Sequence, residues 1–158
     1  MIETLRSLER ELLLLARHQA GPSAARRVDC RTLDRSAYLL LSRLDAEGPM
    51  SIGQLAEAFA LDVSTVNRQT AAALHAGLLA RIPDPEGGIA RKLTITDKGA
   101  RRLDAERERV VDALVQLVGD WSPEDLRQLS ELLERLNIRI EVRDGQRPWP
   151  RSAPVPGR

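Results

Sequence analysis

The chain has 158 residues, of which 42% are hydrophobic and 30% are charged, and its formal net charge is +1. That size suits one ordinary domain with a real core, and the near-neutral charge gives no electrostatic case for nucleic acid at the level of the whole chain. The apolar run at residues 12–16 is far below the roughly 20 residues that a membrane-spanning helix needs. The single cysteine, Cys30, can form neither an internal disulfide nor a thiolate metal site by itself.

The N-terminus and the basic residues give weaker indications. Glu3 comes early and no small-residue cleavage site follows an apolar stretch, so we expect a cytoplasmic protein without a secretory signal. Lys92 and Lys98 are the two lysines, and the other strongly basic residues are all arginine. Arginine suits phosphates and guanine edges, but GC-rich codon usage produces the same excess and is the favoured explanation.

The first part of the chain predicts two amphipathic helices joined by a polar, Arg-rich connection that contains Cys30. Over residues 2–19, apolar side chains recur at helical spacing on one face, namely Ile2, Leu5, Leu8, Leu12 and Leu15. Gly21 and Pro22 end this helix. A second helix is expected over residues 33–46, closed by Gly48 and Pro49.

The middle of the chain predicts two short helices followed by a hairpin. Ser51 and Gln54 fit a capping box at the start of the first helix, and Asp62 can cap a second that runs to about residue 76 and ends at Gly77. Residues 78–82 and 91–96 read as short strands around a turn-rich tip at residues 83–88. Helix, helix, strand, loop and strand in this order make a winged helix-turn-helix.

Two further helices are expected beyond the wing. One runs over about residues 97–118, and Ser122-Pro123 followed by acidic residues is a strong start for the next. That second helix carries apolar residues at strict three-four spacing, a seam that needs a partner helix: Leu126, Leu129, Leu133, Leu136 and Ile140. Residues 144–158 have no periodicity and are expected to form a disordered tail.

The order of these pieces resembles the MarR family of bacterial regulators over about residues 5–142. The resemblance rests on Leu-Ala-Glu at 55–57, Ser-Thr-Val-Asn-Arg at 64–68, Gly-Leu-Leu at 77–79 and Ile-Thr-Asp-Lys-Gly at 95–99. Each fragment is common alone, but their order and spacing are specific. The resemblance implies a mainly α fold with a small β-wing: a single domain at 1–143 with the winged helix-turn-helix at about 33–96 and dimerisation helices at about 1–20 and 97–143.

The resemblance also implies a function, a homodimer that binds double-stranded DNA. The expected activity is repression of a palindromic operator, relieved by a small-molecule effector that binds between the dimer helices and the DNA-binding lobe. The residues expected at the dimer interface are apolar positions of the terminal helices: Leu5, Leu8, Leu12, Leu114, Leu126, Leu129, Leu133, Leu136 and Ile140. Arg107 interrupts the apolar face of the long helix, and we expect it to pair across the dimer with Glu131 or Glu134, or to extend to solvent.

Steps of about 100° per residue divide the second short helix into two faces. The face expected to pack inward carries Val63, Val66, Thr70, Ala73 and Leu74. The outer face begins with small hydroxyls and an arginine, which can hold phosphate and read guanine. The predicted DNA-contacting residues are Ser51, Ser64, Thr65, Asn67, Arg68, Gln69 and His75, with Arg91 and Lys92 in the wing.

The wing departs from the family pattern. Family members often carry Asp-Arg-Arg after the Asp-Pro-Glu of the wing, and this chain has Gly87, Gly88 and Ile89 there. The arginine that usually enters the minor groove is therefore missing. Arg91 and Lys92 can replace it or merely touch phosphate.

Three other functions compete with DNA binding. A winged-helix module that binds protein would show apolar or aromatic anchors on the outer helix face, where this sequence has Ser, Thr, Arg and Ala. A redox-responsive regulator could use Cys30, whose arginine neighbours favour the thiolate. An enzyme is not expected, because no nucleophile–base pair or Gly-rich phosphate loop occurs. No cofactor is expected, and His18 and His75 lack the partners that a metal site needs.

Overall fold

The computed structural model describes residues 1–20 and 33–151. The chain divides into two compact units, Met1–Asp34 and Arg35–Arg158. Within the described residues, no helix is long and apolar enough to cross a membrane. The redox hypothesis concerns Cys30, which lies outside the described residues.

The first unit is built on helix α1 (Ile2–Ala20), which confirms the helix predicted over residues 2–19. Its apolar positions are uncovered, since Leu5, Leu8 and Leu12 keep 56%, 46% and 42% of their surface exposed. A helix in water gains most of its stability from packing such a face. α1 therefore presents a hydrophobic face that the described residues of its own unit do not bury.

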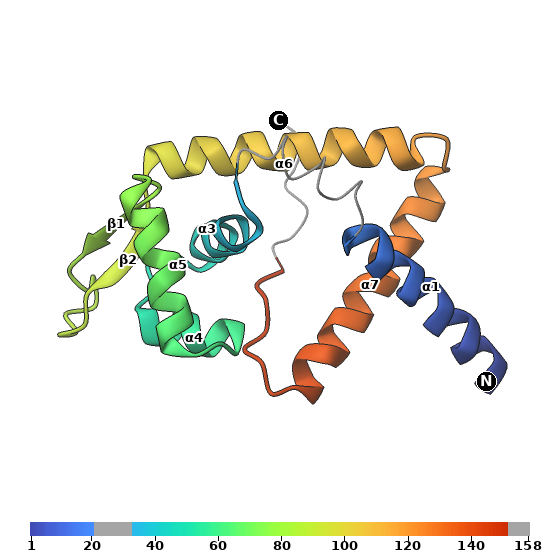
Figure 1. The fold of residues 1–158 in the computed structure, drawn as a ribbon, viewed down its shortest axis with the longest axis horizontal. Coiled ribbons are helices and arrows are strands. Elements are labelled where there is room, and N and C mark those ends of the chain that lie inside the picture. The colour runs from blue at the N-terminus through green and yellow to red at the C-terminus, as the bar shows by residue number, and fades with distance from the viewer. Residues whose placement is uncertain (21–32, 152–158) are drawn as a thin grey trace. The chain divides into compact units, whose positions relative to one another are not determined.

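The second unit holds the remaining elements (Figure 1). They are α3 (Arg35–Glu47), α4 (Ile52–Phe59), α5 (Val63–His75), β1 (Leu79–Ile82), β2 (Lys92–Ile95), α6 (Asp97–Val118) and α7 (Pro123–Arg143). Their order and bounds confirm the sequence-based prediction, with ends that differ by one or two residues. In Figure 1 the β1–β2 hairpin projects beside α5, and α6 runs from the hairpin to α7.

The core of this unit lies around α3. Leu40, Leu41 and Leu44 of α3 are at most 2% exposed, and Leu55, Val66, Leu93 and Leu103 from four other elements are equally buried. Burying one such side chain stabilises a fold by about 1.5–3 kcal/mol. The short helices, the hairpin and the start of α6 are therefore held together as one packed body.

The hairpin is antiparallel, and its register runs from Leu79↔Ile95 to Ile82↔Lys92. Met50, just before α4, forms a bridge to Leu93, with N···O distances of 3.1 and 2.7 Å between the two backbones. This bridge joins the start of α4 to β2. The wing is thus tied to the helix-turn-helix by backbone hydrogen bonds as well as by side-chain packing.

Helix starts agree with the caps predicted at Ser51 and Ser122, but not with the one predicted at Asp62. The capping box of Ser51 and Gln54 is complete, and Thr96 and Ser122 cap α6 and α7 through their hydroxyls. Asp62 occupies the N-cap position of α5, but its side chain makes no capping hydrogen bond. Asp62 therefore marks the helix start by its extended backbone, and the predicted side-chain cap is wrong.

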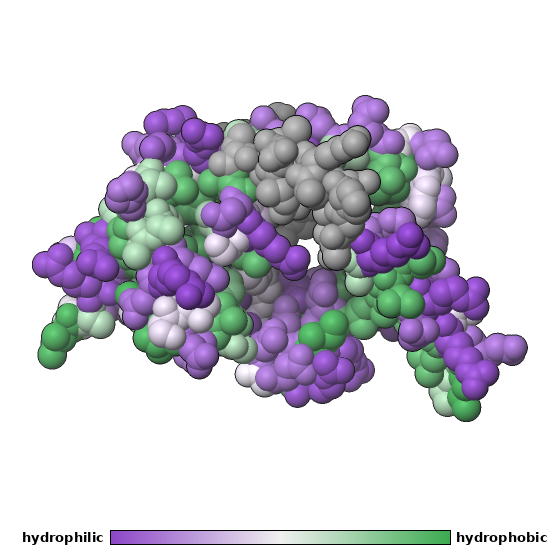
Figure 2. All heavy atoms as spheres, in the orientation of Figure 1, coloured by the Kyte–Doolittle hydropathy of each residue, from purple (hydrophilic) through white to green (hydrophobic). Residues whose placement is uncertain are grey.

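The two long helices are poorly covered. The buried residues of α6 are Gly99, Leu103 and Glu106, all in its first half, and α7 has no buried residue. Exposed apolar side chains on the second half of α6 include Leu114 at 51% and Leu117 at 71%. Some of this surface is visible as green atoms near the junction of α6 and α7 (Figure 2).

Two expectations differ from the structure. Arg107 donates to Asp45 Oδ2 of α3 at 2.8 Å, so its ion pair lies within the chain because α3 and α6 pack together. Residues 145–151, which we call the C-terminal strap, make specific contacts with α3, α4 and α7 where the sequence predicted disorder. Periodicity could not reveal them, since a strap held by single side chains has none.

Candidate DNA interface

Helix α5 presents one uncovered face. Val66, Thr70 and Ala73 are at most 4% exposed, as predicted for the inward side. The predicted outer residues are uncovered: Ser64, Asn67, Arg68, Ala71, Ala72 and His75 are exposed and Thr65 is half-buried. Val63 was expected inside but is 53% exposed, because it occupies the first turn of the helix, beyond the packed part.

Arg68 is the cation best placed on this face. It forms no ion pair with any described residue, and Ala71 and Ala72 beside it are exposed and small. A side chain of this length, free to extend over a small-residue surface, can reach a guanine edge or a phosphate. The uncovered face of α5 therefore combines one long hydrogen-bond donor, Arg68, with small side chains that would let the helix backbone come close to DNA.

Gln69 lies at the border of this face. It lines a hollow of about 260 Å³ between α3, α4 and α5, together with Leu39, Phe59 and Leu61. Its half-buried side chain is thus directed partly toward the domain. Among the predicted base-contacting residues, Gln69 is less available than Arg68.

The turn between α4 and α5 is short and well defined. Ala60 adopts a left-handed conformation with φ 50°, and its N–H donates to the end of α4. Such a residue ends a helix by satisfying its last carbonyl groups. Ser51, at the start of α4, accepts a hydrogen bond from Gln54 N at 3.2 Å, so its hydroxyl is used as a cap and retains its proton for one further donor contact.

Lys92 does not lie free in the wing. Its side chain is only 10% exposed, and its Nζ lies 2.8 Å from Asp84 Oδ1 and 3.2 Å from Glu86 Oε2. The hydrogen bond from Lys92 lowers the pKa of Asp84, and Asp84 in turn raises the pKa of Lys92. The contact of Lys92 with DNA stays a prediction, and Lys92 is less available for it than Arg91 because its charge is already paired with two carboxylates of the wing.

Arg91 remains the exposed cation at this end of β2, and it forms no ion pair with any described residue. The wing tip carries Ile89, which is fully exposed, and Gly87, whose φ of +82° needs a glycine. Apolar atoms at the outer end of the wing are visible in Figure 2. The wing tip thus presents a glycine turn and one exposed apolar side chain, and Arg91 is an exposed positive charge close to it.

The predicted dimerisation residues are uncovered in the monomer. Leu114, Leu126, Leu129, Leu133 and Ile140 expose between 36% and 51% of their surface, and Leu136 is half-buried. Apolar side chains this exposed over a whole helix mark an interaction surface. The seam on α7 is therefore an uncovered apolar surface of the kind that packs against a partner helix.

A cluster around Arg43 was missed by the sequence analysis. Arg43 of α3 is fully buried, pairs with Glu47 and donates to Pro148 O at 3.0 Å. Burial lowers the pKa of its guanidinium, and Glu47 opposes that effect. An arginine at a helix position next to buried leucines was the available signal, because such a residue needs a partner from elsewhere in the chain.

The geometry agrees with known regulators. The model of the MarR family matches residues 33–87, which span α3, α4, α5 and the first strand of the wing. A Bacillus subtilis protein, called an uncharacterized HTH-type transcriptional regulator YxaD, is 40% identical over 105 residues, covering 66% of this chain and 73% of that protein.

Solved structures show the same fold over nearly the whole chain. A MarR family protein from Bacillus stearothermophilus superposes with a TM-score of 0.75 at 20% identity, covering 89% of this chain and 97% of that one. A MarR family transcriptional regulator from Silicibacter pomeroyi DSS gives a TM-score of 0.63 at 28% identity, covering 84% and 88%. The chain therefore has the fold of MarR family proteins.

Proposed function

The chain belongs to the MarR family of transcriptional regulators, and from this premise we propose that it is a homodimeric repressor of a palindromic operator. The observation that carries the proposal is the uncovered face of α5, on which Arg68, exposed and without an ion pair to any described residue, lies beside Ser64 and two exposed alanines. This face has the chemistry of a helix that enters the major groove. A small-molecule effector relieves the repression.

Dimerisation is supported by surfaces that one chain leaves open. The apolar faces of α1 and α7 are exposed, and α7 has no buried residue. Packing these faces against a second copy removes them from water and places two recognition helices on one DNA duplex. A palindromic operator follows from the two-fold symmetry of such a dimer.

The net charge of the DNA-facing segment limits the affinity of one subunit. Lys92 is paired with wing carboxylates, whereas Arg68 on α5 and Arg91, just before β2, are exposed. In a dimer, both subunits make each contact with a phosphate or a base. Two half-sites that each bind weakly therefore give a dimer that binds the whole operator more tightly. Binding is expected to weaken steeply with salt, since it releases counterions from the DNA.

The test is operator binding by the purified protein. DNA from its own upstream region and random DNA are titrated at several salt concentrations. Tighter binding to the upstream DNA, with affinity falling as salt rises, supports the proposal. Equal and feeble binding to both, followed by no enrichment in a selection from random sequences, contradicts it and favours a protein-binding module.

Arg68→Ala is the sharpest variant for this test. It should lose about 1–3 kcal/mol of specific binding and relax specificity at one base pair, with little change in the urea midpoint. Arg135→Ala is the matched control, since Arg135 is exposed like Arg68 but lies on α7 outside the apolar seam, and it should leave operator affinity unchanged. Unchanged operator affinity in Arg68→Ala would remove Arg68 from the residues that read DNA.

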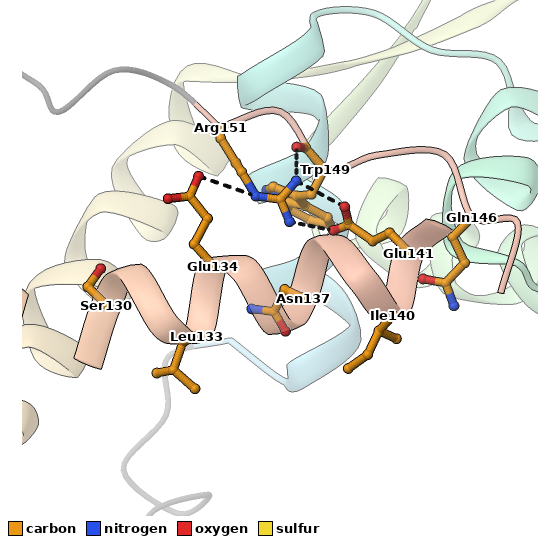
Figure 3. Close-up of a pocket in the computed structure, with 9 residues that line it drawn as sticks. All are labelled: Ser130, Leu133, Glu134, Asn137, Ile140, Glu141, Gln146, Trp149 and Arg151. Carbon is orange, nitrogen blue, oxygen red and sulfur yellow. Dashed lines mark hydrogen bonds and ion pairs between the residues drawn. The ribbon is translucent and has the colours of Figure 1, made fainter. Parts of the chain in front are cut away.

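The effector site is proposed in the hollow between α7 and the C-terminal strap (Figure 3). It has a volume of about 620 Å³ and is lined by Leu133, Asn137, Glu141, Trp149 and Arg151, among others, a size typical of small-molecule sites. In a Trp121→Phe background, a compound that releases operator DNA should change the fluorescence of Trp149. A releasing compound that leaves this emission unchanged would place the effector site elsewhere.

A further inference from the structure

The C-terminal strap starts with a turn that only glycine makes easily. Gly145 has φ +62°, and Gln146 N donates to Glu141 O at 2.9 Å. This arrangement ends α7 in the manner of a left-handed cap. The chain therefore leaves the axis of α7 at a defined position, and residues 147–151 run back along the unit.

One end of the strap is fastened to α7. Arg151 donates from Nη1 and Nη2 to the two carboxylate oxygens of Glu141, each at 2.9 Å, and its Nε lies 3.7 Å from Glu134. Figure 3 shows both glutamates directed toward Arg151 while Leu133 and Ile140 point away from it. A two-point arginine–carboxylate pair fixes direction as well as distance. The strap thus occupies the polar face of α7 and leaves the apolar seam open.

The other contacts fasten the strap to the helix-turn-helix. Arg147 pairs with Glu47 at the end of α3, and the ring of Trp149 lies 6.3 Å from that of Phe59 in α4. The guanidinium carbon of Arg43 lies 5.1 Å from the centre of the Trp149 ring. Cation–π and aromatic contacts of this kind are strongest where water is excluded, and Arg43 is fully buried.

Arg43 makes the strap necessary for this arrangement. A buried guanidinium is costly unless its donors are satisfied, and the strap supplies the Pro148 carbonyl at 3.0 Å and the face of Trp149. Arg43 keeps its ion pair with Glu47 without the strap, but its Nε finds no acceptor among the described residues, so the loss of both strap contacts would leave most of the buried guanidinium without further partners. The strap and α3 therefore hold each other in a single position.

We propose that the C-terminal strap fixes the orientation of the helix-turn-helix relative to α7, and that Arg147, Trp149 and Arg151 are positioning residues for operator recognition. α7 has no buried residue of its own, so the strap contacts and the turn after α6 are what define its direction. Given the proposed dimerisation through α7, on which this inference rests, the strap sets the distance between the two recognition helices. It thereby selects the half-site spacing of the operator.

The experiment measures affinity against half-site spacing. Full-length protein, Trp149→Ala and Trp149→Phe are titrated with a selected operator and with versions whose half-sites are moved apart or together by one and two base pairs. The wild type should prefer one spacing. Trp149→Ala should bind that spacing about tenfold more weakly while the differences between spacings shrink, since pre-organisation is lost, and Trp149→Phe should restore the preference.

A charge exchange tests the contact between the C-terminal strap and α7. Arg151→Glu should flatten the spacing profile, and Glu141→Arg combined with Arg151→Glu should recover it, because the pair is remade in reverse. Urea midpoints and sedimentation of every variant identify any that is unfolded or monomeric. A folded, dimeric Trp149→Ala with a uniformly lower affinity and an unchanged spacing preference overturns the proposal.

Hydrogen exchange separates this inference from the proposed function. Faster exchange at the C-terminal end of α7 and in α3 of Trp149→Ala, compared with Trp149→Phe, supports the strap even if no operator is bound. Unchanged exchange in both helices overturns it. Absence of operator binding by the wild type counts against the proposed function alone.

Discussion

At the scale of single residues, the ion pair between Lys92 and Asp84 holds the two sides of the wing loop together. The Nζ of Lys92 lies 2.8 Å from Asp84 Oδ1, and both side chains are largely buried. Asp84 also accepts from Glu86 N at 3.0 Å. One carboxylate therefore holds the loop on both sides of the glycines, and the shape of the wing tip depends on its ionisation.

The stability of the protein should depend on this carboxylate in a defined pH range. Lys92 holds the pKa of Asp84 below its usual value, so the ionised group stabilises the fold above about pH 4 and this gain is lost as the pH falls through the lower folded value. The raised pKa of Lys92 adds a gain that is complete below about pH 10 and lost as the pH rises through the folded value.

Asp84→Asn should accordingly be less stable than the wild type at pH 7. Urea unfolding of both proteins over a pH series should show the difference closing on the acidic side, because protonated Asp84 no longer attracts Lys92. A difference in unfolding free energy that stays constant from pH 7 to pH 3 would contradict the pairing.

Single residues also show what the sequence could not predict. Lys92 was identifiable as a wing cation, but its ion pairs form only when the hairpin brings residues 84 and 86 beside it. Val63 belongs to the inward face by its angle on the helix, yet it is 53% exposed because packing covers only the later turns. Such outcomes depend on neighbours far along the chain, which periodicity does not specify.

At the scale of elements, α6 meets the hairpin through a glycine. A Cβ on Gly99 would collide with the backbone carbonyl of Leu78 and press on Ile95, and Gly99 is buried. Thr96 stabilises the same junction, since its hydroxyl donates to Gly77 O at 2.9 Å and accepts from Gly99 N at 3.0 Å. The close approach fixes how the long helix leaves the wing.

Gly99→Ala should therefore destabilise the protein by about 1–3 kcal/mol, the usual range for overpacking, because a backbone carbonyl cannot move aside as a flexible side chain does. Gly53→Ala is the matched control: its Cβ would meet only Ser51 Oγ, at 3.8 Å, and it should stabilise α4 by about 0.5–1 kcal/mol. Urea midpoints at constant m-value measure both. Equal effects of the two substitutions would refute this account of the junction.

Elements were predictable where their signals are local. The capping box at Ser51 and the hydroxyl caps at Thr96 and Ser122 define helix starts within four residues, and α6 begins and ends where its periodicity does. The C-terminal strap has no such signal. Its order comes from Arg43, about a hundred residues earlier in the chain, so no local pattern could reveal it.

At the scale of the whole molecule, the open seam of α7 predicts the oligomeric state. Leu133→Glu puts a charge in the middle of this seam, where Leu133 is 43% exposed in one chain. A buried unpaired carboxylate is strongly unfavourable in an interface, so the variant should sediment as a monomer and lose operator binding. Arg135→Glu, at an exposed position of α7 outside the seam, should remain dimeric.

A dimeric Leu133→Glu variant would exclude this seam as the interface. The fold itself should survive in the monomer, since α7 contributes no buried residue and the core around α3 is complete without it. Circular dichroism at the same concentrations checks that point.

The uneven burial of α6 has a mechanical consequence. Its buried residues lie in the first half, so the helix moves with the wing, and its 22 residues make a rod about 33 Å long at about 1.5 Å per residue. Tilting such a rod by about 5° displaces one end relative to the other by about 3 Å, close to the rise of about 3.4 Å per base pair along the axis of DNA. α6 therefore acts as a lever: if its far end is held at α7, a tilt of this size shifts the helix-turn-helix at its packed end by about one base-pair step.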